Sequence, residues 1–100
     1  MTNSIPQRSF PMKAVITVTG RDTVGIIAKV STVCAEYGVN IRDISQSVLD
    51  EYFAMIMLAE IDGLTIKFSD FSDRLALLGE GEGLQIHAMH EDIFNSMHRI

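Results

Sequence analysis

The most constraining stretch of this chain is Tyr52 to Ile61, which reads YFAMIMLAEI and is apolar at odd and even positions alike. In a β-strand, successive side chains point to opposite faces of the sheet, so this stretch is apolar on both faces. A strand with one face in water usually alternates apolar with polar residues instead. The stretch is therefore predicted to be a central strand that needs cover on both of its faces.

The flanking sequence predicts three more strands, in the alternating or β-branched segments Met12–Thr19, Val39–Leu49 and Leu84–His90. In the second of them the apolar phase slips between Ile41 and Ile44, which predicts a β-bulge. Asp50-Glu51 is expected to form the tight turn that leads into the central strand.

Helical spacing, with apolar residues three and four apart, appears between the predicted strands. The first helix is expected from about Val24 to Tyr37. The second is expected from about Ser69, as its N-cap, to Gly79 or slightly beyond. A short third helix, from Glu91 to Ile100, has an apolar stripe.

The resulting order, β-α-β-β-α-β plus a terminal helix, predicts an α+β fold of the ferredoxin-like, split βαβ type. In this fold a four-stranded antiparallel sheet has the strand order 4-1-3-2 and carries both main helices on one face. Each large apolar side chain left exposed on the other face forfeits about 1.5 to 3 kcal/mol. We therefore expect the C-terminal helix to cover part of that face and a second copy to cover the rest, in a homodimer or a higher oligomer.

Composition argues against several classes of partner. The 100 residues carry eight basic and thirteen acidic side chains, a formal charge of −5, which disfavours direct binding to nucleic acid. No apolar run approaches the roughly 20 residues that span a membrane. Cys34, the single cysteine, lies on the apolar side of the first predicted helix and indicates a buried thiol in a reducing compartment, so a cytoplasmic location is expected.

The best candidate binding site is the loop Gly20–Ile27, where the apolar period changes from two to 3.6. Asp22 is expected to be the N-cap of the first helix, and Gly20 and Gly25 allow a tight turn. Backbone N–H groups at a helix N-terminus attract anions and carboxylates. The alternative is that Asp22 only caps the helix and Gly25 only permits packing.

A metal site and a catalytic site are both disfavoured. The spacing of His87, His90 and His98 matches no closed tetrahedral metal site, and on a strand His87 and His90 point to opposite faces. We therefore expect no metal and no other cofactor. No nucleophile stands at a defined spacing from a base, so we expect a protein that is not an enzyme.

The segment VTGRDTVGIIAKVSTVCAEYGVNIRDISQS, with its Asp22-x-x-Gly25 turn and its Gly38-x-Asn40-Ile41 spacing, resembles the ACT domain family of small regulatory modules. The ending HEDIFNSMHRI resembles that of stand-alone bacterial proteins with a single ACT domain, which are similar to the ACT modules of a glycine-cleavage transcriptional regulator. The resemblance implies one ACT-like domain over residues 12–100, and the prolines Pro6 and Pro11 among polar residues predict a flexible leader of residues 1–11. The chain departs from many members at Val24, where they have proline.

The resemblance further implies a regulatory module that binds an amino acid or related small metabolite between two subunits. Its pocket is formed by the first turn of one subunit and the second strand of its neighbour, which here means Asp22, Thr23, Val24, Gly25 and Ile26 facing Asn40 and Ile41. The Asn40 amide both donates and accepts, which suits a zwitterion, although Asn40 could equally satisfy its own backbone at the strand entry. The alternative function is a protein–protein docking domain with no small ligand, and the sequence names no regulated partner.

Overall fold

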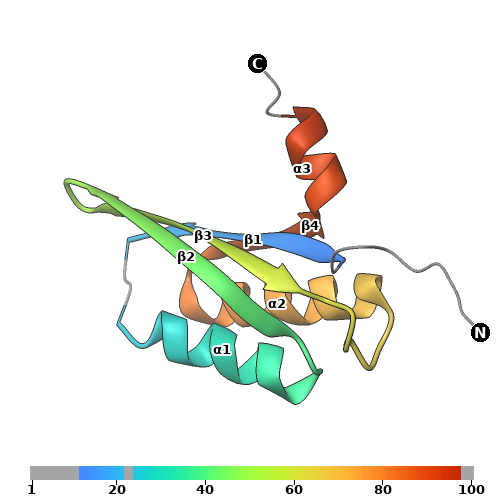
Figure 1. The fold of residues 1–100 in the computed structure, drawn as a ribbon. Helices are drawn as coiled ribbons and strands as arrows, with labels where there is room; N and C mark the ends of the chain where they lie inside the picture. The colour runs from blue at the N-terminus through green and yellow to red at the C-terminus, as the bar shows by residue number, and fades with distance from the viewer. Residues whose placement is uncertain (1–11, 22–23, 98–100) are drawn as a thin grey trace, which may run out of the picture.

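A four-stranded antiparallel sheet with the order β2-β3-β1-β4 organises the computed structural model of the chain, which describes residues 12–21 and 24–97 (Figure 1). Its strands are β1 (Lys13–Gly20), β2 (Asn40–Leu49), β3 (Tyr52–Glu60) and β4 (Gln85–His90). The strand order is the predicted one, and β3 lies between β1 and β2 as its apolar faces require. The expected leader, residues 1–11, lies outside the described residues.

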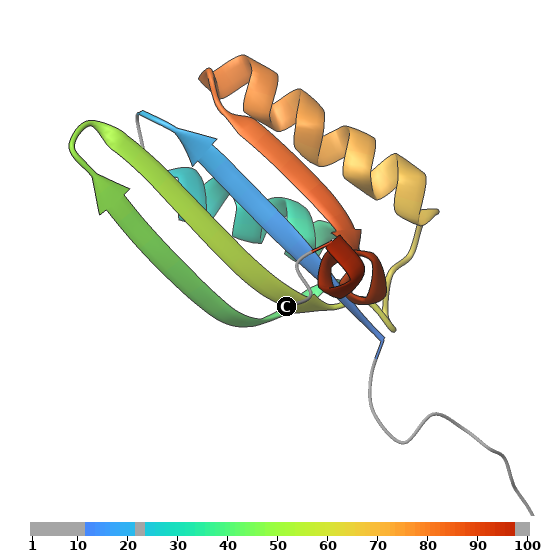
Figure 2. The ribbon, with the colours of Figure 1, turned by 90° about the horizontal axis from the view of Figure 1, so that it is seen from above.

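Two helices, α1 (Ile26–Glu36) and α2 (Phe68–Glu82), lie side by side on one face of the sheet, which confirms the predicted fold class (Figures 1 and 2). We call the other side of the sheet the open face. The register of β1 against β3 places Ile16 opposite Met57 and Val18 opposite Met55, with all four side chains turned toward the helices and fully buried. These residues meet Val30 of α1 and Phe71 and Leu75 of α2 in one core.

The start of α1 differs from the prediction. The helix begins at Ile26, two residues later than expected, and its N-cap is Gly25 rather than Asp22. Gly25 has φ 73° and ψ 2°, a left-handed conformation that a helix cannot continue through and that glycine adopts without strain. Asp22 and Thr23 themselves lie outside the described residues.

The N-cap of α2 also differs from the prediction. The helix begins at Phe68 with Lys67 in the N-cap position, so Ser69 is a helical residue and not the cap. The helix continues slightly beyond Gly79, as the prediction allows, to Glu82, and closes on Gly83 at φ 73°. Gly79 remains helical because it packs directly on β4: a Cβ there would lie 2.8 Å from the backbone oxygen of Leu84 and 3.0 Å from Cγ1 of Ile86.

The predicted irregularity in β2 is confirmed. The register of β2 against β3 shifts between Ile41 and Asp43, so Arg42 is the extra residue of a β-bulge. Past the bulge, Ile44 pairs with Met57 on the helix side and Ser45 pairs with Ile56 on the open face. Because of the bulge, Ile41 before it and Ile44 after it both face the helices and pack against the core.

The third helix, α3 (Glu91–Met97), covers one end of the open face, where Val15 of β1 is only 4% exposed, and leaves the rest of that face open. It rises from the end of β4 on the side away from α1 and α2 (Figure 1), and it is seen nearly along its axis from above (Figure 2). None of its described residues is buried, and Ile93 and Met97 are 51% and 65% exposed. Within the described part of one chain, the open face beyond Val15 thus lacks the cover that its apolar residues predict, and Tyr52 and Ile56 are about half exposed.

We expect Gly79→Ala to lower the free energy of unfolding by about 1 to 3 kcal/mol, because the new methyl group must displace the backbone of Leu84, just before β4. Gly81→Ala is the matched control in the same helix, since nothing lies within 4 Å of a Cβ at that position. This second change should be neutral or stabilise by up to about 1 kcal/mol. Urea unfolding of both variants measures the difference, and equal effects would contradict the packing role of Gly79.

Candidate ligand-binding site

The loop between β1 and α1 presents an open helix N-terminus. No side chain among the described residues caps α1, and its first turn holds no acidic residue. Ile26 is buried in the core, whereas Val24 is 85% exposed and Gly25 is also exposed. A Cβ at Gly25 would meet nothing within 4 Å. The backbone at Gly25 is therefore held by buried Ile26 on one side and open to a ligand on the other.

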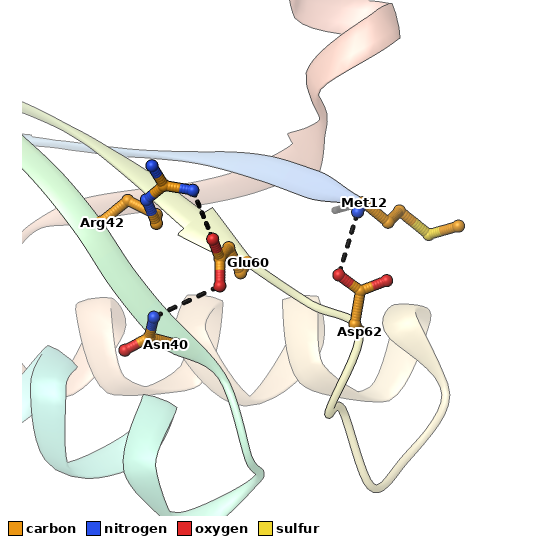
Figure 3. Close-up of polar contacts among 5 residues, drawn as sticks. All are labelled: Met12, Asn40, Arg42, Glu60 and Asp62. Atoms are coloured by element: carbon orange, nitrogen blue, oxygen red, sulfur yellow. Dashed lines mark hydrogen bonds and ion pairs between the residues drawn. The ribbon is translucent and has the colours of Figure 1, made fainter. Parts of the chain in front are cut away.

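The second group of candidate residues lies at the start of β2, around the carboxylate of Glu60 (Figure 3). Asn40 donates from Nδ2 to Oε1 of Glu60 over 3.3 Å, and Arg42 donates from Nη1 to Oε2 of the same carboxylate. These hydrogen bonds, that from Arg42 first and that from Asn40 second, hold the pKa of Glu60 below its ordinary value. The carboxylate is therefore ionised at neutral pH and bridges the bulge of β2 to the end of β3.

The hydrogen bond to Glu60 fixes the orientation of the Asn40 amide. Its Nδ2 is turned toward the carboxylate, and its oxygen points away from Glu60 (Figure 3). The side chain thus bonds to the neighbouring strand and presents an acceptor outward, next to an ionised carboxylate. Ile41, the following candidate, is partly buried and packs against the core instead. Of these two residues, only Asn40 presents a polar group at the surface.

Within one chain the two groups of candidate residues are far apart. Asn40 pairs with Glu60, which pairs with Lys13 at the start of β1, whereas Gly20 at the end of β1 pairs with Phe53. Seven strand residues separate the two ends of the sheet, or about 23 Å at 3.3 Å per residue. One chain therefore does not bring the loop of Gly25 and the amide of Asn40 together.

A feature that the sequence did not predict is a hollow on the open face at the β2–β3 hairpin, with a volume of about 330 Å³. It is lined by Thr19, Gly20, Ser47, Leu49, Tyr52, Phe53 and Ala54. The guanidinium of Arg21 lies 5.4 Å from the centre of the Tyr52 ring at its rim and pairs with Glu51 over 3.0 Å. The sequence signal for this hollow is a row of small residues across three strands, because Ala54 pairs with both Thr19 and Ser47.

His87, His90 and Cys34 lie where the sequence predicts. His87 pairs with Thr17 on the open face, while the His90 ring lies on the helix side, 4.2 Å from the centre of the Phe68 ring. Residues 12–21 and 24–97 contain no group of three or more His, Cys, Asp or Glu side chains that could hold a metal, and His98 lies outside them. Cys34 is buried, and burial raises the pKa of its thiol to about 11, so it stays an unreactive thiol at neutral pH.

Residues 13–88 match a family model described as the ACT domain. The chain belongs to the ACT domain family. A UPF0237 protein of Listeria monocytogenes is 45% identical to it over 89 residues, which are 89% of this chain and all of the relative. An ACT domain protein from Streptococcus pneumoniae has a TM-score of 0.73 and 41% identity over 85% of this chain and 96% of its own. A putative glycine cleavage system transcriptional repressor has a TM-score of 0.63 and 26% identity over 82% of this chain and 47% of its own.

ACT domains are small regulatory modules that often bind amino acids, and the family points to regulation rather than catalysis. In the described part of this ACT domain, no helix is long and apolar enough to cross a membrane.

We expect the carboxyl of Glu60 in this ACT domain to titrate below the ordinary glutamate value of about 4.3. Because its folded pKa is lowered, the stability that it contributes is present above the unfolded pKa and is lost as the pH falls through the folded pKa. Arg42→Ala should raise the pKa of Glu60 more than Asn40→Ala does, since the bond from Arg42 is the larger cause. Carboxyl titration by NMR measures all three proteins, and an unchanged pKa in Arg42→Ala would contradict this assignment.

Proposed function

We propose that this ACT domain protein is a cytoplasmic regulatory module that binds an amino acid or a related small metabolite between two copies of the chain. The observation that carries the proposal is the separation of its two candidate groups. The open helix N-terminus after Gly25 and the outward amide oxygen of Asn40 have complementary chemistry, yet they lie at opposite ends of one sheet. A ligand that contacts both therefore needs residues from two subunits.

The edge position of β2 supplies an arrangement that satisfies this requirement. β2 is an edge strand of ten residues, most of them exposed, and such an edge readily pairs with another strand. A two-fold axis beside it sets the β2 strands of two copies antiparallel. The Asn40 end of one copy then lies beside the Leu49 end of its partner, near the loop of Gly25. We propose a homodimer of this kind, with two equivalent ligand sites.

The chemistry of the two groups fits an α-amino acid. A carboxylate is attracted to the backbone donors and the positive end of α1, and Gly25 leaves space for its close approach. An α-ammonium group needs acceptors, and the Asn40 oxygen together with the ionised Glu60 carboxylate supplies them. The likeness to the glycine cleavage repressor supports a regulatory role for this binding.

A second candidate function is docking onto another protein with no small ligand. The observation that favours it is the open face, where Tyr52 and Ile56 of the central strand are about half exposed. Monomeric proteins rarely leave a large contiguous apolar patch in water. Ligand-dependent stabilisation distinguishes the two functions, because docking without a small ligand does not produce it.

Thermal unfolding against each of the twenty amino acids tests the proposed function. A ligand at 100 times its Kd stabilises the folded state by about 2.7 kcal/mol, which shifts the Tm of a domain of this size by several degrees. A selective shift with one or a few amino acids is the expected result. A flat response to all twenty, with the protein dimeric by light scattering, would contradict amino-acid binding and support docking.

We expect Gly25→Asp to abolish the ligand-induced shift, because it adds a negative charge where the ligand carboxylate approaches. Gly83→Asp is the matched control: Gly83 also has φ 73°, a Cβ there also meets nothing within 4 Å, and it ends α2 away from the site. Both variants should lose similar stability from backbone strain, but only Gly25→Asp should lose the response. Retention of the shift in Gly25→Asp would place the ligand elsewhere.

A further inference from the structure

The carboxylate of Glu60 is the centre of the candidate group at the start of β2 (Figure 3). Asn40 donates from Nδ2 to its Oε1 over 3.3 Å, and Arg42 donates from Nη1 to its Oε2. An ionised carboxylate offers about four acceptor positions on its two oxygens. Within residues 12–21 and 24–97, β2 therefore occupies one position on each oxygen and leaves about two for a further donor.

The amide of Asn40 adds a further acceptor beside this carboxylate. Because Nδ2 is turned toward Glu60, the amide oxygen points away from it, on a residue that is exposed (Figure 3). An ionised carboxylate and an amide oxygen only accept hydrogen bonds. The start of β2 thus presents about three acceptor positions, side by side, to whatever approaches it.

The cations near this group do not occupy these acceptor positions. The guanidinium of Arg42 is already paired with Glu60, and the two side chains are 48% and 24% exposed. Lys13 lies opposite Glu60 on β1, whereas Asn40 lies opposite it on β2, with β3 between them. Glu60 therefore stands between Lys13 and the Asn40 amide, and its pairing with Arg42 keeps it ionised.

Three classes of acid with the same carbon skeleton differ in what they offer to such a group. A 2-amino acid carries an ammonium group with three donors, a 2-hydroxy acid carries one hydroxyl donor, and a 2-oxo acid carries only an acceptor at the same carbon. A site built to bind a donor rejects an analogue that lacks it, because the polar groups of the site are then left unpaired. The three donors of the ammonium group match the three acceptor positions.

We propose that Glu60 is a specificity-determining residue of the ligand site and that, together with Asn40, it selects 2-amino acids over the 2-hydroxy and 2-oxo acids of the same skeleton. This inference rests on the proposed function, which places the ligand carboxylate at the loop of Gly25 in one copy. The group on the α-carbon then lies at Glu60 of the other copy. All three acids share the carboxylate, so the loop of Gly25 does not distinguish between them.

This selectivity gives the module a place beside one class of reaction. Transamination and deamination exchange the amino group of a substrate for an oxo group and leave its carboxylate and carbon skeleton unchanged. A protein that selects through Glu60 responds to the substrate of such a reaction and not to its product. It therefore reports the aminated form of the metabolite rather than the total amount of its carbon skeleton.

The first test uses the unaltered protein and isothermal titration calorimetry. Each amino acid that shifts the Tm is compared with its hydroxy and oxo counterparts, such as alanine with lactate and pyruvate, or glutamate with 2-hydroxyglutarate and 2-oxoglutarate. We expect the affinity to fall in that order, as the number of donors falls. The Kd of the oxo acid should exceed that of the amino acid by about 10-fold or more, the effect of losing one hydrogen bond to a charged group.

Glu60→Gln assigns the selectivity to this residue, because the new amide presents a donor where the carboxylate only accepts. We expect the ratio of the oxo-acid Kd to the amino-acid Kd to fall toward one, with an unchanged circular dichroism spectrum. Glu82→Gln is the matched control, since Glu82 is also ion-paired, with Lys29 over 2.7 Å, and its side chain is 35% exposed. Any effect of Glu82 on the shared ligand carboxylate applies to both acids, so the ratio should stay unchanged.

The outcomes separate this inference from the proposed function. Equal or tighter binding of the oxo acid, or an unchanged ratio in Glu60→Gln, would overturn the role of Glu60 and leave amino-acid binding in place. A ratio that falls equally in Glu82→Gln would also overturn it. Absence of binding by all three classes of acid would contradict the proposed function and this inference together.

Discussion

The fold depends on the cover that β3 finds for its two apolar faces. On one face, Met55 and Met57 are fully buried beneath α1 and α2, and their cross-strand partners Val18 and Ile16 fix the register of β1. A slip of one residue would turn every one of these side chains to the other face, so the register is strongly specified. On the other face, the described part of one chain covers only the end at Val15, and Tyr52 and Ile56 of β3 are about half exposed. The structure therefore has one face completed by its own helices and one that points to a partner.

The order of elements could be predicted because the apolar period changes at each boundary, and period is the strongest signal in a single sequence. The bulge in β2 could be predicted equally well, since Ile41 and Ile44 cannot share a face of a regular strand. The first and last residues of the helices could be predicted less well. Glycine usually ends a helix, but Gly79 continues one because β4 leaves no room for a side chain, and only the packing reveals this. The extent of the cover from α3 could not be predicted for a similar reason: its apolar stripe indicates a contact but not how much of the open face the helix reaches.

The candidate site could be predicted only as two separate groups. The turn at Gly25 and the strand entry at Asn40 were recognisable from their residue types and spacing. Neither the roughly 23 Å between them nor the hydrogen bonds of Glu60 follow from local sequence, because both depend on the register of β2 against β3. Glu60 in particular looked like a polar end of an apolar strand. In the structure it orients Asn40 and remains ionised through Arg42.

The bulge at Arg42 also limits how this chain can change in length. Residues before it and after it belong to opposite phases of the strand, and the extra residue allows Ile44 to face the helices while Ser45 and Ser47 face outward. Deletion of Arg42 would join the two phases into a regular strand and turn Ile44 outward and Ser45 into the core. Replacement of its side chain would keep the strand phase and remove the hydrogen bond and ion pair to Glu60. The fold should therefore tolerate other residue types at this position. A deletion or insertion here would have to be matched by a second insertion or deletion in the same strand.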